Sequence, residues 1–120
     1  MRHLKTLGTL AIVMVFSTIS GRAQETKTED GLRTYLIERD IPKAGEFTEE
    51  ELVGISKKSC AVLEKMTDIE WLNSYIVDNK VYCLYRATEP KLIYQHAEDA
   101  GFPVTNIMEI GSVIGPKTAN

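Results

Sequence analysis

Three stretches of the chain alternate apolar and polar residues with a period of two, which is typical of β-strands. The first covers 33–41, rich in β-forming residues, and the last covers 106–114 near the C-terminus. Between them, 69–86 contains two such runs separated by Asp78 and Asn79. Both residue types tolerate a positive φ, so this stretch predicts a β-hairpin with a two-residue turn.

Two further stretches carry apolar residues at helical spacing and have clear start and stop signals. Thr48 with Glu51 three residues later forms a capping box, and the apolar stripe behind it predicts a helix over 49–66. A second helix is expected to start at Pro90, capped by Thr88 or Glu89, and to end before Gly101, a favourable residue after a helix C-terminus.

The order strand, helix, strand, strand, helix, strand is that of the split βαβ arrangement. We therefore expect an α+β fold, a ferredoxin-like βαββαβ two-layer sandwich whose four-stranded antiparallel sheet carries two helices on one face. The domain should cover 32–115, with a flexible tail at 24–31 and a C-terminal tail at 116–120.

Helices on one face leave the other face of the sheet uncovered. The strand alternation predicts that this face exposes Trp71, Tyr75, Tyr82 and Leu84. Exposed aromatic residues are unusual on a small monomer, so we expect a homodimer that packs sheet on sheet. A monomer with a scattered apolar surface, a ligand cleft and a partner protein are the alternatives.

The N-terminus has the pattern of a secretory signal peptide. Basic residues come first, an apolar run covers 7–19, and the small residues Gly21 and Ala23 follow. We expect cleavage after Ala23 and export to the periplasm or medium, with no membrane association afterwards. The alternative is an uncleaved membrane anchor, although the run is shorter than the roughly 20 residues that span a bilayer.

Removal of residues 1–23 makes the protein more acidic. Of the 120 residues 97 remain, and loss of Arg2, Lys5 and Arg22 lowers the basic count from 14 to 11 against 17 acidic residues, a net charge of −6. This charge disfavours binding to nucleic acid or anionic lipid and permits binding of cations.

His96 is the only histidine after residue 23 and lies on the apolar side of the second predicted helix. A packed core residue, a metal ligand and a general acid or base are the three interpretations, because imidazole is both the commonest transition-metal ligand and a proton carrier near neutral pH. Glu38 on the first strand is either an ordinary surface charge or an additional oxygen ligand.

Cys60 and Cys83 are the two cysteines of the chain, and both are expected to face the layer between the first helix and the sheet. An exported protein meets oxidising conditions, so a disulfide joining them is one interpretation. Two buried thiols and two soft metal ligands are the others. A disulfide would exclude thiolate ligation.

Four segments taken in order resemble a small bacterial family of domains of unknown function that includes a nickel-binding member. They are YLIERDIP at 35–42, SKKSCAVL at 56–63, WLNSYIVDNKVYCLYRA at 71–87 and HAEDAGFP at 96–103. The resemblance implies a ferredoxin-like homodimer and a bound divalent transition metal such as nickel. The residue types of the family recur at Cys60, Trp71, Tyr82, Cys83 and His96.

We therefore expect an exported metal-binding module with His96, Cys83, Cys60 and Glu38 as candidate ligands. A small cofactor-free enzyme of the dimeric monooxygenase or isomerase type is the alternative, by analogy of fold, and predicts a roomy pocket near His96 and Tyr85. A purely structural or interaction domain is the third hypothesis.

Overall fold

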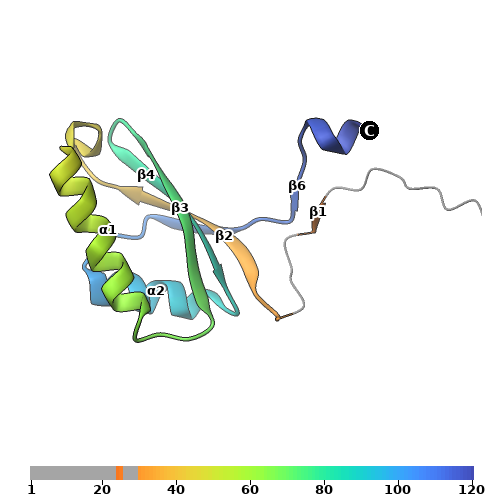
Figure 1. The fold of residues 1–120 in the computed structure, drawn as a ribbon, viewed down its shortest axis with the longest axis horizontal. Coiled ribbons are helices and arrows are strands. Elements are labelled where there is room, and N and C mark those ends of the chain that lie inside the picture. Colours follow the sequence, from red (N-terminus) through yellow and green to blue (C-terminus); the bar gives the residue numbers. More distant parts are fainter. Residues whose placement is uncertain (1–23, 26–29) are drawn as a thin grey trace, which may run out of the picture.

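A computed structural model describes residues 24–25 and 30–120 and confirms the α+β, ferredoxin-like fold. A four-stranded antiparallel sheet has the order β3-β4-β2-β5. Figure 1 shows both helices on the same side of this sheet. The strands are β2 (Arg33–Asp40), β3 (Ile69–Val77), β4 (Lys80–Ala87) and β5 (Asn106–Glu109), and the helices are α1 (Glu49–Leu63) and α2 (Pro90–Ala100).

The starts of both helices and the end of α2 follow the predicted signals, whereas α1 ends at Leu63, before the predicted end at residue 66. At α1 the Glu51 backbone N–H donates to Thr48 Oγ1 at 3.2 Å, and Glu51 Oε1 accepts from the Thr48 backbone N–H at 3.2 Å. At α2 the N-cap is Glu89, and Gly101 closes the helix with a φ of 75°. The 3-10 helix η1 (Ala44–Glu46) precedes α1.

The hairpin of β3 and β4 has the predicted two-residue turn, with Val77 paired to Lys80 and Asp78 at a φ of 52°. A β-bulge between Trp71 and Asn73 then changes the register, so that Trp71 pairs with Tyr85. Because a one-residue shift turns side chains to the opposite face, Trp71 lies on the side covered by the helices. The prediction that Trp71 lies on the uncovered face is therefore wrong.

The core lies between the helices and the inward face of the sheet. Alternate residues of β2 and β4 are buried, as the period of two requires. Ile37, Tyr85 and Ile93 are each at most 2% exposed, and they bring together β2, β4 and α2. The uncovered face carries the partly exposed remainder, including Tyr75, Tyr82 and Leu84.

The C-terminal strand is shorter than predicted. β5 ends at Glu109, and a separate strand β6 (Ser112–Val113) pairs with β1 (Gln24–Glu25), so two residues of the expected N-terminal tail are in a strand. The 3-10 helix η2 (Pro116–Ala119) follows in the predicted C-terminal tail. Figure 1 shows β6 and η2 to one side of the sandwich.

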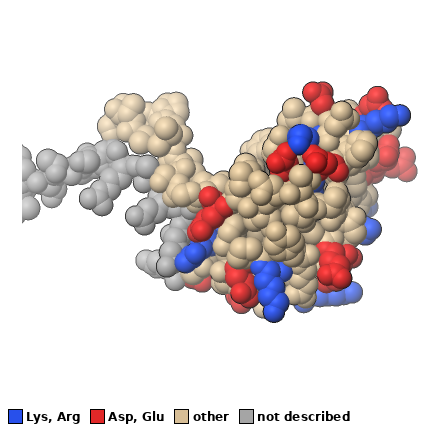
Figure 2. Space-filling view, turned by 180° about the vertical axis from the view of Figure 1, so that it is seen from behind, with Lys and Arg blue, Asp and Glu red and all other residues tan. Residues whose placement is uncertain are grey.

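The predicted signal peptide, residues 1–23, lies outside the described residues. Within the described ranges, no helix is long and apolar enough to cross a membrane. Figure 2 shows one side of the domain, where acidic and basic side chains border an area without charge. Part of the surface on this side therefore carries no charged side chain.

Candidate functional site

A group of polar side chains lies between α1 and the inward face of the sheet, centred on Arg39 of β2. Arg39 is 2% exposed, and its Nη1 donates to the Pro103 carbonyl oxygen at 2.8 Å. Its Nε lies 3.5 Å from Cys83 Sγ, which also accepts from Ser74 Oγ at 2.9 Å. Ser74 Oγ in turn accepts from Trp71 Nε1 at 3.0 Å. Contacts among β2, β3 and β4 thus hold the Cys83 sulfur and the Arg39 guanidinium in place.

His96 of α2 is fully buried beside this group. Its Nε2 lies 3.2 Å from Ser59 Oγ and 3.4 Å from the Ser59 carbonyl oxygen on α1, and its ring packs 5.3 Å from that of Tyr85. No hydrogen-bond partner for Nδ1 is found among the described residues. Since a carbonyl oxygen only accepts, we assign the proton to Nε2, which leaves a lone pair on Nδ1.

Burial shifts the ionisation of His96 and of the neighbouring Tyr85. Burial lowers the pKa of His96; Arg39 lowers it further, while the Ser59 backbone and Asp99 oppose the shift. Burial also raises the pKa of Tyr85, although Ser59 and Arg39 act in the opposite direction. Both groups are therefore neutral at pH 7, because the desolvated interior disfavours their charged forms.

A cavity of about 850 Å³ lies between α1 and the sheet. Its walls are largely apolar and come from α1, β3, β4 and the segments after β2 and α2. Arg39, Trp71, Cys83 and Tyr85 line it, whereas His96 does not. The roomy pocket that the enzyme hypothesis requires is thus present beside Tyr85, but it does not reach the imidazole.

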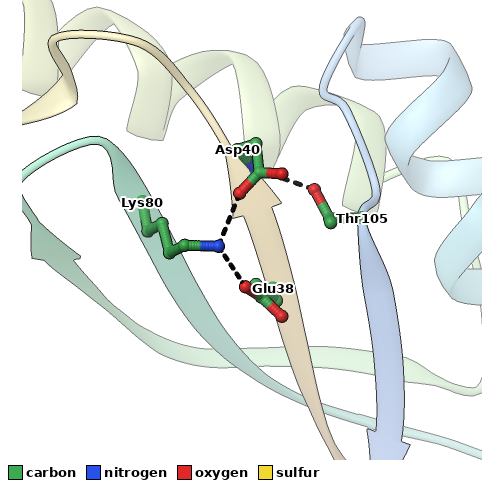
Figure 3. A network of polar contacts seen from close by, with 4 residues as sticks. All are labelled: Glu38, Asp40, Lys80 and Thr105. Carbon is green, nitrogen blue, oxygen red and sulfur yellow. Dashed lines mark hydrogen bonds and ion pairs between the residues drawn. The ribbon is translucent and has the colours of Figure 1, made fainter.

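A separate polar network lies on the uncovered face of the sheet. Lys80 Nζ forms an ion pair with Glu38 Oε1 and lies 2.8 Å from Asp40 Oδ1 (Figure 3). The Asp40 backbone N–H donates to Thr105 Oγ1 at 2.9 Å. The hydrogen bond to Lys80 lowers the pKa of Asp40, and that to Asp40 raises the pKa of Lys80. Glu38 is therefore already paired with a cation.

The four candidate metal ligands do not converge in one chain. Glu38 lies on the uncovered face, Cys60 is exposed on α1, and only Cys83 and His96 lie in the layer between helices and sheet. Across residues 24–25 and 30–120, no group of three or more His, Cys, Asp or Glu side chains is placed to hold a metal ion.

Both cysteines are free thiols, Cys60 exposed and Cys83 buried. The prediction that both face the layer is wrong for Cys60, and the structure contains no disulfide between them. Cys60 lies one turn beyond Ser56 on α1, and the buried Ser59 takes the inward position beside it.

Two residues of the site were missed by sequence reasoning. Arg39 follows Tyr35 and Ile37 at a spacing of two, and this alternation would have placed it on the buried face. Ser74 pairs with Cys83 across the hairpin, but the contact of its hydroxyl with the Cys83 sulfur has no sequence signal.

Comparison with known proteins relates the chain to a described family. The model of the family called nickel responsive protein SCO4226-like matches residues 35–110. The crystal structure of SCO4226 from Streptomyces coelicolor A3(2) superposes with a TM-score of 0.58 at 14% identity, covering 68% of this chain and 99% of that one. None of the curated proteins compared with the chain matches it. The family match spans most of the domain, and the chain belongs to the SCO4226-like nickel responsive protein family.

Proposed function

We propose that the protein is an exported, homodimeric module that binds a divalent transition metal such as nickel through His96. The observation that carries the proposal is the buried imidazole whose Nδ1 has no hydrogen-bond partner in the described part of the chain. A buried nitrogen with a free lone pair is costly unless something binds to it, and neutral imidazole is a common ligand of nickel and related ions. The family name supports a response to nickel.

The residues of one chain fit a metal only in part. His96 and Cys83 offer nitrogen and sulfur donors in one layer, while Cys60 and Glu38 face elsewhere. A complete ligand set therefore needs further donors such as water, because a second copy on the uncovered face would lie on the other side of the sheet from His96. When bound, the ion would be held rather than used for a reaction, and the protein's role would be to keep it away from bulk water.

Export and dimerisation rest on two separate features. The signal-like segment supports export. The uncovered sheet face supports a dimer, because Tyr75 and Val77 are 52% and 53% exposed there. Apolar side chains on an open sheet are commonly buried by a second copy.

The test is the nickel content of the purified protein after loading and desalting, measured by mass spectrometry of the metal. Wild type should retain nickel, and His96→Ala should lose most of it. Cys83→Ser should also retain less nickel, whereas Cys60→Ser should behave as wild type because Cys60 lies outside the layer. Equal retention by wild type and His96→Ala would contradict the proposed role of His96.

The cavity beside Tyr85 supports a small-molecule function as the second candidate. Its volume of about 850 Å³ lies within the range of ligand sites in proteins. Dimeric ferredoxin-like domains that act as monooxygenases or isomerases give the same expectation by analogy of fold. Since His96 does not line the cavity, this function does not require nickel at the imidazole.

A further inference from the structure

We infer that the cavity between α1 and the sheet binds a small amphiphilic monocarboxylate, with its apolar body in the cavity and its carboxylate against the guanidinium of Arg39. This site does not include the proposed nickel ligand His96, which does not line the cavity, although Cys83 lines it and contacts Arg39. The inference depends on an unbalanced buried charge and on the chemistry of the cavity walls.

Arg39 has no carboxylate partner in the described part of the chain. Its Nη1 is bound to a neutral carbonyl of Pro103, its Nε faces the Cys83 sulfur, and its Nη2 is buried without a partner. The rings of Phe102 and Tyr85 lie 5.5 Å and 6.0 Å from its Cζ. Buried charges are usually paired, since desolvation is not repaid by neutral neighbours alone. An anion is the missing complement.

The other charged residues around the cavity leave this positive charge uncompensated. The Glu51 carboxylate is used in the capping box with Thr48, and the Asp40 carboxylate binds Lys80. Lys58 adds a second cation to the lining, with its Nζ 3.4 Å from the position that a Cβ on Gly101 would take. The lining thus holds two cations and two carboxylates, and the case for an anionic ligand rests on Arg39, whose guanidinium has no carboxylate within hydrogen-bond distance in the described part of the chain.

The walls and the free donors specify the kind of anion. Phe47, Leu52, Ile55 and Ile76 line the cavity and suit a hydrocarbon body. The single positive charge of Arg39, near neutral hydroxyls, matches a singly charged carboxylate. A dianionic phosphate is disfavoured, because the carboxylates of Asp40 and Glu51 line the same cavity.

Trp71 provides the measurement, because it is the only tryptophan of the chain and lines the cavity. Octanoate is the probe and octanamide, of equal length and without charge, is its control. We expect octanoate to change the Trp71 fluorescence of the wild-type protein saturably, with an affinity about tenfold or more above that of octanamide. No saturable change, or equal affinities, would overturn the inference without any variant.

Substitution of Arg39 then tests its role. Arg39→Met should bind octanoate and octanamide with about equal affinity, because the neutral side chain removes the charge that selects the carboxylate. Arg33→Met is the matched control, since Arg33 lies on the same strand, is exposed and is paired with Glu109; it should keep the wild-type preference. A folded Arg39→Met protein that still prefers octanoate would overturn the role of Arg39.

Discussion

At the scale of single residues, the burial of His96 should make the stability of the protein depend on pH. Burial lowers the pKa of His96 in the folded protein, whereas in the unfolded chain it should be close to the ordinary value of about 6.5. Below that pH the unfolded chain binds a proton that the folded protein does not, so the free energy of unfolding falls as the pH decreases. The stabilising contribution of the neutral His96 to the free energy of unfolding is therefore fully present above about pH 6.5 and is lost as the pH falls below that value.

The measurement is urea unfolding of wild type and His96→Gln between pH 7.5 and pH 5.0. The wild-type free energy of unfolding should decrease by up to about 1.4 kcal/mol per pH unit more than that of the variant, because one group contributes at most this slope. Carboxylates that titrate below pH 5 are common to both proteins. A parallel pH dependence in the two proteins would show that His96 titrates alike in the folded and unfolded states.

The same residues show how far sequence reasoning reaches. Helical spacing correctly placed His96 inside, because an apolar stripe has only one side that can be buried. Alternation along β2 contained the signal for Arg39, but the residue type argued for a surface position. For Trp71, the bulge that turns it inward left no recognisable pattern. The polar contacts of Cys83 depend on three segments brought together by the fold.

At the scale of elements, α1 begins at a complete capping box that should be measurable by substitution. Thr48→Ala removes the oxygen that accepts from the Glu51 backbone N–H, and leaves an exposed helix end. We expect the free energy of unfolding to fall by about 1 kcal/mol. Thr48→Ser keeps the hydroxyl and should stay within about 0.5 kcal/mol of wild type in the same urea titration. Equal losses in both variants would assign the effect to the methyl group instead.

Element boundaries were predictable where local chemistry fixes them. The turn at Asp78 and the ends of α2 at Pro90 and Gly101 depend on residues whose conformational preferences are local. The division of the C-terminal strand into β5 and β6 was not predictable, because β6 pairs with β1, which is far away in the sequence. A non-local partner leaves no trace in the periodicity of one strand.

At the scale of the whole molecule, the uncovered sheet face is the feature that a second copy would bury. Along β4 this face presents Tyr82 and Leu84 as partly exposed residues, and β3 and β5 add Tyr75 and Met108, which are 52% and 41% exposed. Sheets that pack face to face bury such residues about 10 Å apart. A bulky charge in the middle of this face should therefore prevent association.

Light scattering after size-exclusion chromatography measures the mass that decides this prediction. Wild type should elute as a dimer at micromolar concentration, and Leu84→Arg should elute as a monomer, because an arginine would be desolvated between the two sheets without a partner. Val53→Arg is the control: Val53 is 52% exposed on α1, away from the sheet, and its substitution should leave the dimer intact. A monomeric wild type, or a dimeric Leu84→Arg protein, would require the apolar face to be explained by another partner.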